Sequence, residues 1–254
     1  MMLEHLITYF SDILPVGQDD GGLVVAWWLC AFCAAFCLFA SELSGDSSMV
    51  DRLWSLTPAA YAWIFFVFGD YGNSKAFVMC ILITMWSARL TYNFARKGGY
   101  TSHGEDYRWP YLKKHYVKSR AEWLVFNLTF IASYQNVLLL WIALPVHIVM
   151  MYGSRDATVI NFNLIDLMAT VLFLVFFLGE TIADHQQFVF QTEKYRRKGL
   201  GNKDLMVGDY KRGFLTSGLF RYSRHPNFFC EQAMWVTIYA FTISSTNEVF
   251  HVSG

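Results

Sequence analysis

The chain has 254 residues, of which 55% are hydrophobic, 18% aromatic and only 16% charged. An average soluble domain has roughly 25% charged residues, so this composition is typical of a protein whose exterior faces lipid. The formal net charge is zero, and the basic clusters lie between apolar stretches, which gives no basic surface suited to nucleic acid. We therefore predict an all-α, polytopic transmembrane bundle of about six helices, at roughly 20 apolar residues per crossing.

The predicted crossings follow an N-terminal segment, 1–22, which is acidic and lacks the basic start of a secretory signal. The six apolar stretches are 23–40, 56–68, 76–94, 123–152, 164–183 and 232–244. Pro145 marks a point at which the fourth stretch can break. No repeat or linker divides the sequence, so residues 1–254 are predicted to form a single membrane domain.

The basic residues predict the orientation. Of the 20 lysines and arginines, 16 fall in the polar segments 95–121 and 184–230. If 123–152 and 164–183 each cross once, both segments lie on one side of the membrane, which the positive-inside rule makes cytoplasmic. Counting back along the chain places the turn at 41–55 on the same side. Three polar segments are therefore expected to converge on one cytoplasmic face.

The cysteines do not suggest a metal site or a disulfide framework. Cys30, Cys33 and Cys37 share one face of the first apolar stretch, with no second pair of ligands nearby in the sequence. We interpret them as small residues of the core. Gln135, inside the fourth stretch, is interpreted as an interhelical hydrogen-bonding residue.

Two groups of polar residues lie at the edge of apolar stretches, where ionisable side chains are functional candidates. Asp51 and Arg52 precede Trp54, and they form either a reactive acid with its partner or a local ion pair beside an interfacial anchor. Trp86, Arg89 and Asn93 are spaced i, i+3, i+7 and share a helical face. Arg89 either snorkels to the interface or points inward to a carboxylate or phosphate.

A third group depends on how far the fifth helix extends. Glu180, Asp184, Gln187 and Gln191 are spaced i, i+4, i+7, i+11, so they share one face if the helix continues past Ala183. Two carboxylates one turn apart repel each other unless donors lie between them. Such a row is either a solvated helix end or a surface that suits ribose hydroxyls.

The most specific run extends from Gly218 to Glu231 and contains Ser223-Arg224-His225-Pro226-Asn227. Its arginines suit phosphate, its asparagine suits an amide, and its glutamate suits a hydroxyl. The earlier run His103–Trp109 is either a solvated turn with interfacial aromatic residues or part of a site.

Taken together, these residues resemble the integral membrane steroid 5-alpha-reductase family, and within it the DUF1295 branch. The resemblance covers about residues 45–235, with the C-terminal motif at 184–231. It rests on Val50–Trp54 with Pro58, Trp86–Leu90 with Asn93, Gly98–Tyr100, Glu105–Arg108, Gln135, Asp184 with Gln186 and Gln187, Gly218–Asn227 and Glu231.

The resemblance implies NADPH-dependent reduction of a carbon–carbon double bond conjugated to a carbonyl, in a sterol-like or other lipid. It implies catalytic roles for Asp51, which lies seven residues before Pro58, and for Trp86 and Arg89. The implied cofactor-binding residues are Asp184, Gln187, Arg221, Tyr222, Ser223, Arg224, His225, Asn227 and Glu231. For a eukaryotic protein it also implies residence among the membrane lipids of the endoplasmic reticulum.

The sequence departs from the steroid reductases at several positions. Val50 stands where those enzymes have a glutamine, and Trp86 stands where they have an aromatic hydroxyl, which argues against a steroid substrate. Cys230 replaces a glycine before Glu231. Family members usually have seven helices, whereas here one apolar stretch follows the motif, so we expect a truncated product or an incomplete site.

Two other functions fit part of the pattern. Membrane lipid and isoprenylcysteine methyltransferases share an Arg-His-Pro motif near a later glutamate and bind S-adenosylmethionine, but their typical chain lacks Asp51 and the 105–108 run. A non-catalytic membrane subunit could keep the fold within a larger assembly.

Overall fold

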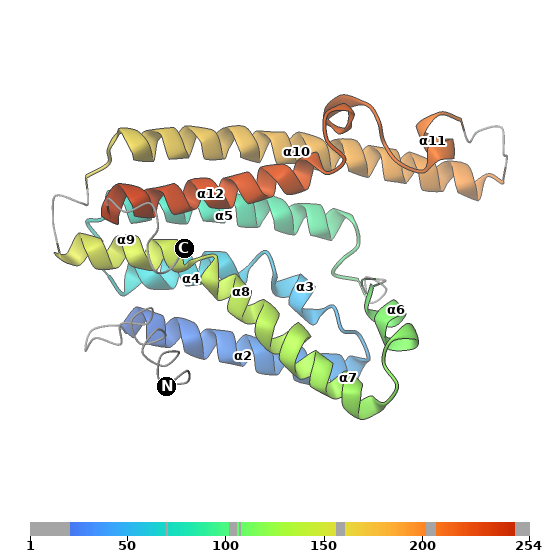
Figure 1. Cartoon of the computed structure of the whole chain (residues 1–254), viewed down its shortest axis with the longest axis horizontal. Coiled ribbons are helices and arrows are strands. Elements are labelled where there is room, and N and C mark those ends of the chain that lie inside the picture. Colours follow the sequence, from blue (N-terminus) through green and yellow to red (C-terminus); the bar gives the residue numbers. More distant parts are fainter. Residues whose placement is uncertain are drawn as a thin grey trace, which may run out of the picture. The chain divides into compact units, whose positions relative to one another are not determined.

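The computed structural model describes residues 21–69, 71–101, 106, 108–155, 161–201 and 207–246. These residues form helices and turns and contain no strand, which confirms the predicted all-helical class. Figure 1 shows the helices coloured along the chain, which divides into two compact units. The first unit runs to Leu167 and also includes the residues from Tyr239 onward, and the second is Met168–Ile238.

The first unit is built around a short apolar helix. This helix, α4 (Thr57–Val67), has Pro58 in its first turn and packs against α2 (Gly21–Ser44) and α5 (Ser74–Arg96). The remaining elements are α3 (Met49–Leu53), α6 (Arg108–His115), α7 (Arg120–Phe126), η1 (Asn127–Tyr134), α8 (Gln135–Trp141) and α9 (Leu144–Arg155). α8 and α9 complete the packing around α4, so this short helix is the centre of the unit.

Within the described part of the chain, four helices have the length and apolar character to cross a membrane: Gly21–Ser44, Ser74–Arg96, Arg120–Gly153 and Leu164–Gly199. They correspond to the predicted stretches 23–40, 76–94, 123–152 and 164–183. α4 is a shorter apolar helix at the predicted stretch 56–68. The chain is therefore a membrane protein. The predicted break near Pro145 is present, since α8 ends at Trp141 and α9 begins at Leu144.

The fourth crossing contains a π-helical segment that the sequence did not reveal. The rings of Phe126, at the end of α7, and of Phe130 and Tyr134, in η1, stack along one side, with centroid separations of 5.2 and 5.6 Å. The Asn127 side-chain amide donates to Ser41 Oγ at 2.7 Å and to Glu42 Oε1 at 3.0 Å. These hydrogen bonds fix the start of η1 to the end of α2.

A buried ion pair joins three helix ends of the first unit. Lys75 Nζ lies 3.2 Å from Asp166 Oδ2, with side-chain exposures of 1% and 0%. The same ammonium group donates to Ser244 Oγ at 2.7 Å. Asn163 donates to Ser244 Oγ at 2.8 Å, and its own Oδ1 accepts from the backbone of Ile165. The starts of α5 and α10 and the end of α12 (Pro226–Thr246) are therefore held by one polar cluster.

The second unit contains most of α10 (Leu164–Gly199), α11 (Asp209–Arg212), η3 (Gly218–Arg221) and most of α12. The sequence predicted a polar segment from Asp184, but the helix continues to Gly199. Glu193 supports this extension because it accepts hydrogen bonds from Arg196 and Arg197, three and four residues later. A helix of this length extends about 54 Å, which exceeds a hydrocarbon core of about 30 Å.

Candidate functional site

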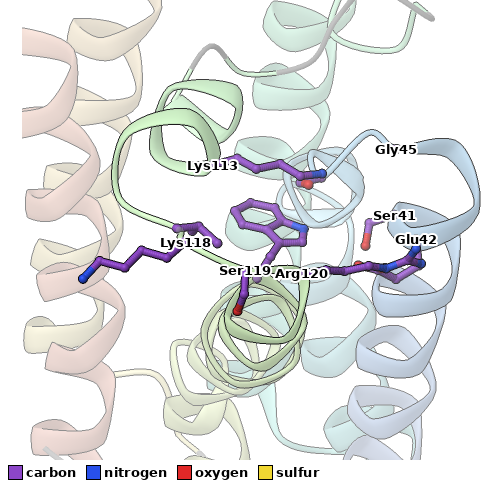
Figure 2. A pocket seen from close by; sticks show the side chains of 10 residues that line it. Ser41, Glu42, Gly45, Lys113, Lys118, Ser119 and Arg120 are labelled. Carbon is purple, nitrogen blue, oxygen red and sulfur yellow. The ribbon is translucent and has the colours of Figure 1, made fainter.

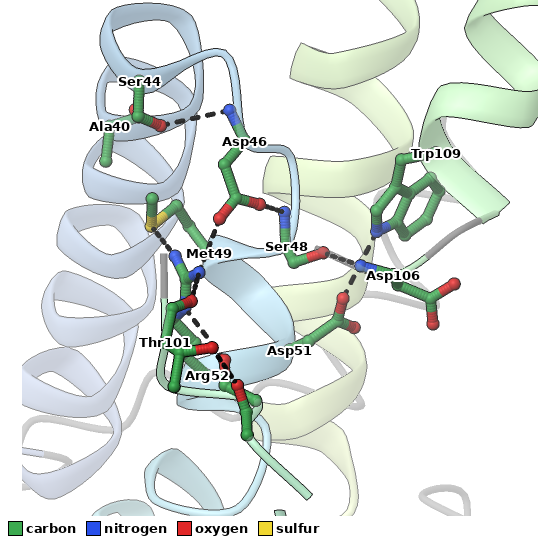
Figure 3. A network of polar contacts seen from close by, with 12 residues as sticks. Ala40, Ser44, Asp46, Ser48, Met49, Asp51, Arg52, Thr101, Asp106 and Trp109 are labelled. Carbon is green, nitrogen blue, oxygen red and sulfur yellow. Dashed lines mark hydrogen bonds and ion pairs between the residues drawn. The ribbon is translucent and has the colours of Figure 1, made fainter. Parts of the chain in front are cut away.

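Asp51 lies in α3, the short helix between α2 and α4. The indole N–H of Trp109 donates to Asp51 Oδ2 at 3.2 Å (Figure 3). The carboxyl group is half-buried, and burial raises its pKa, although the hydrogen bond from Trp109 opposes this effect. The nearby Asp106 charge raises the pKa further. The pKa of Asp51 therefore lies above that of an ordinary aspartate, with burial as the main cause.

The residues around Trp109 come from the loop after α5. Ser48 Oγ accepts from the Asp106 backbone N–H at 2.8 Å, which brings this loop against the start of α3. Burial alone would raise the pKa of Asp106, but hydrogen bonds and the charge of Arg108 lower it. Arg108 Nε and the Arg108 backbone N–H donate to the Asp106 carboxylate at 2.9 and 2.8 Å. Asp106 is thus held as an anion beside a carboxyl group whose pKa is raised.

Arg52 does not form the local ion pair with Asp51 that one interpretation of the sequence suggested. Its guanidinium pairs with Asp46 at 2.5 Å and also donates to the carbonyl oxygens of Gly99 and Thr101. The Asp46 carboxylate in turn accepts from the Ser48 backbone N–H at 2.9 Å. Figure 3 shows this arginine network on the side of α3 away from Trp109. Arg52 therefore pairs with Asp46, and Asp51 accepts its hydrogen bond from Trp109 instead.

Helix α5 carries the other predicted catalytic residues. Trp86 is 1% exposed and Asn93 is 6% exposed, which places both on the buried face of the helix, and Arg89 is half-buried between them. Asn93 Oδ1 accepts two hydrogen bonds from Arg96, at 2.6 and 2.9 Å. The shared face of Trp86, Arg89 and Asn93 is confirmed.

Within the second unit, the structure brings two predicted cofactor residues together. The Asn227 side-chain amide donates to Asp184 Oδ1 at 3.3 Å, from the first turn of α12 to the middle of α10. Asp184 is 4% exposed, and Glu180, one turn earlier, is 2% exposed. The predicted row from Glu180 to Gln191 therefore lies on one continuous helix, α10. Its two carboxylates, Glu180 and Asp184, are buried.

The run between η3 and α12 is exposed. Arg221, Tyr222, Ser223, Arg224 and His225 all face solvent. Ser223 Oγ accepts from the His225 backbone N–H at 3.2 Å, and Pro226 then begins α12. Helix starts leave backbone N–H groups without intrahelical partners, which attract anions. Two arginines and a histidine thus stand at a helix start above the Asp184–Asn227 contact.

Gln186, rather than the neighbouring Gln187, makes the visible contact to the motif. Gln186 Oε1 accepts from the Leu219 backbone N–H at 3.0 Å. Gly218 has a φ of +61°, and a Cβ there would lie 2.5 Å from the Gln186 amide. The glycine is therefore required both for the turn and for the close approach. Gln186 was part of the motif resemblance but not of the predicted site, because spacing alone cannot separate adjacent glutamines.

An aromatic and basic cluster secures the segment after α10. Arg197 lies 4.0 Å above the Tyr210 ring, and Tyr210 stacks on Phe190 with ring centroids 5.2 Å apart. Lys194 Nζ donates to the Gly213 carbonyl at 2.8 Å. These residues fold 207–217 back onto α10. No sequence signal identified Tyr210, because its partners are 13 to 20 residues distant in the chain.

Cys230, which stands where the resemblance led us to expect glycine, is accommodated by a glycine on the other helix. A Cβ on Gly179 would lie 2.9 Å from Cys230 Sγ. Gly179 therefore leaves room for the Cys230 side chain within the α10–α12 contact. All five cysteines are free, and Cys30, Cys33 and Cys37 are buried as expected.

Some predicted features lie outside the described residues, among them His103, Glu105 and Tyr107. Among the residues that the structure does describe, no group of three or more histidine, cysteine or acidic side chains is arranged to hold a metal ion.

Comparison with known proteins agrees with the motifs. The family model described as "Protein of unknown function (DUF1295)" matches residues 37–253. An uncharacterised protein of Schizosaccharomyces pombe is 36% identical over 209 residues, which cover 77% of this chain and 57% of that protein. The chain therefore matches little more than half the length of this relative. No solved structure matches. The chain belongs to the DUF1295 family.

Proposed function

We propose that this protein is an NADPH-dependent membrane reductase that acts on the double bond of a lipid enone. The observation that carries the proposal is the exposed run 221–225, which stands at the start of α12 beside the part-buried Asp184–Asn227 contact. Exposed cationic side chains next to buried hydrogen-bonding groups suit a ligand that has both phosphates and a nucleoside.

The residues of the second unit fit this cofactor. Arg221 and Arg224 can bind phosphate oxygens in a bidentate manner, and the start of α12 adds backbone donors. Asp184 is an acceptor for ribose hydroxyls, and Asn227 already orients it. S-adenosylmethionine has no phosphate, so the two arginines favour NADPH over the methyl donor.

In the first unit we assign Asp51 to the substrate carbonyl. The Trp109 indole N–H can only donate, so it occupies Oδ2 as an acceptor and leaves the acid proton on the other carboxyl oxygen. A neutral carboxylic acid held in this way stabilises the oxyanion that forms when an enone is reduced. Asp51 thus acts as a hydrogen-bond donor, and Trp109 as the residue that positions it.

The proposed reaction adds one hydride and one proton across the double bond of the enone. NADPH held by the residues of the second unit would supply the hydride for the β carbon of the enone. The resulting enolate oxygen accepts a hydrogen bond from Asp51, and a proton from solvent then adds to the α carbon, which gives the saturated ketone. Trp86 and Arg89 are proposed to shape and order the substrate side of the site. We further propose that the motif segments face the cytoplasm, on the endoplasmic reticulum in a eukaryotic cell, with a sterol-like or other lipid as substrate.

Nucleotide binding by the purified full chain tests the cofactor assignment. We expect NADPH to bind more tightly than NADH, and Arg224→Gln to weaken NADPH binding about ten-fold or more through loss of a charge-assisted contact. Lys211→Gln is the matched control, because Lys211 is an exposed cation of the same unit outside the motif. Binding of S-adenosylmethionine in preference to NADPH would overturn the proposal in favour of a methyltransferase.

Turnover tests the role of Asp51 separately. With NADPH and a panel of enone lipids, Asp51→Asn should abolish NADPH oxidation while leaving NADPH affinity unchanged. A chain that binds no nucleotide and co-purifies with other membrane subunits would instead indicate a non-catalytic role.

A further inference from the structure

A polar pocket of about 490 Å³ lies in the first unit, between the end of α2 and the segment that joins α6 to α7 (Figure 2). Its charged lining residues are Glu42, Lys113, Lys118 and Arg120, and Ser41 and Trp123 contribute to its walls. None of these residues belongs to the site proposed above. Figure 2 shows Lys113 and Arg120 extending toward the side where Ser41 and Glu42 lie, while Lys118 extends the other way.

The position of the pocket is set by two candidate membrane spans. Gly21–Ser44 ends at the pocket and Arg120–Gly153 begins there. The ends of membrane-spanning helices lie at the level of the lipid headgroups, where tryptophan and snorkelling basic residues gather. Trp123 is 4% exposed, and Lys113 Nζ lies 5.0 Å from the centre of its ring. The pocket therefore opens at headgroup depth over an aromatic wall.

The charges in the pocket do not cancel one another. Lys113, Lys118 and Arg120 are exposed, and the structure records no ion pair between any of them and a described carboxylate. The Glu42 carboxylate does not neutralise these cations. Its Oε1 accepts a hydrogen bond from the Asn127 side-chain amide at 3.0 Å. The pocket thus offers cations suited to a phosphate and, on the side toward which Lys113 and Arg120 extend, one carboxylate.

We propose that this pocket binds the headgroup of an aminophospholipid. The phosphate lies between Lys113 and Arg120, whose guanidinium can bind two phosphate oxygens. The ammonium group of the headgroup meets the Glu42 carboxylate, and the acyl chains extend along the outer surface of α2, where Phe32, Phe36 and Phe39 are exposed. Basic pockets between membrane helices bind lipid headgroups in this manner.

The experiment is native mass spectrometry of the full chain in detergent, titrated with phosphatidylethanolamine, phosphatidylglycerol or phosphatidylcholine of matched acyl chains. We expect phosphatidylethanolamine to bind most tightly. Arg120→Gln and Lys113→Gln should each weaken it about five-fold, the effect of one basic residue at a membrane surface. Glu42→Gln should remove the preference for phosphatidylethanolamine over phosphatidylglycerol, because phosphatidylglycerol has no ammonium group.

Two controls make the result decisive. Lys114→Gln removes an exposed lysine of the same helix, α6, that does not line the pocket, so it should leave lipid binding unchanged. Soluble glycerophosphoethanolamine distinguishes a lipid from a free phosphate compound, and it should compete only weakly because it lacks acyl chains. Equal binding by wild type, Arg120→Gln and Lys113→Gln would overturn the proposal. Complete displacement by equimolar soluble headgroup would overturn the assignment to a lipid.

Discussion

Replacing Lys75 by methionine should destabilise the protein strongly, because it leaves the Asp166 carboxylate in a buried site without its cation. The two side chains are 1% and 0% exposed, and their charged atoms are 3.2 Å apart. The substitution also removes one of the two donors to Ser244 Oγ, so the start of α5 loses its contact with the end of α12.

The magnitude follows from the distance and the burial. At an effective dielectric constant of about 20, two charges at this separation attract by about 5 kcal/mol. Part of this attraction offsets desolvation of the two groups, and breaking one partner of a buried pair costs about 3–5 kcal/mol. For a chain of this size we therefore expect the thermal midpoint to fall by about 10 °C.

Thermal unfolding in detergent, followed by circular dichroism, measures this effect. Lys114→Met is the matched control, because it makes the same change at an exposed lysine and should leave the midpoint within about 2 °C. The double variant Lys75→Met/Asp166→Leu removes both charges and should recover most of the lost stability. A double variant that loses the sum of the two single effects would refute the reasoning, because the two charges would then act independently.

Three further predictions concern the two candidate regions. Because burial raises the pKa of Asp51, the stabilisation from its protonated form is fully present below about pH 4 and is lost as pH rises through the folded pKa. The ¹⁵N shift of the Trp109 indole should therefore titrate above pH 4, and Asp51→Asn should abolish this titration. Gly218→Ala should cost about 1–2 kcal/mol of stability because of its positive φ, whereas Gly199→Ala, in open space, should cost nothing measurable by thermal unfolding. Arg52→Gln should increase amide exchange at 99–101 by breaking two backbone contacts, and unchanged protection there would contradict its linking role.

The helical architecture could be read from the sequence because long apolar runs have few alternatives in a membrane. The spans near Gly21–Ser44 and Ser74–Arg96 differ from prediction by only a few residues at each end. The extension of α10 beyond Asp184 was harder to predict, because its residues become polar there. It depends on local pairs such as Glu193 with Arg197, which spacing permits but does not require.

The candidate sites could be predicted in part. The Asp184–Asn227 contact joins two motifs that the sequence had already assigned to one site. The partner of Asp51 was not predicted, because Trp109 is 58 residues away in the chain and no sequence pattern links the two residues. The pairing of Lys75 with Asp166 was missed for the same reason, because each residue alone resembles an ordinary helix end.

Burial separates the structural charges of this protein from those that can serve a ligand. Lys75 and Asp166 are buried and satisfy each other, so an added ligand would have to break the pair. The cations of 221–225 and of the Lys113–Arg120 pocket are exposed, and binding an anion costs them little desolvation. Asp51 lies between these extremes, half-buried with one hydrogen bond and a raised pKa. A group in this state can change its protonation during a reaction, which is why we place the carbonyl donor there rather than at either extreme.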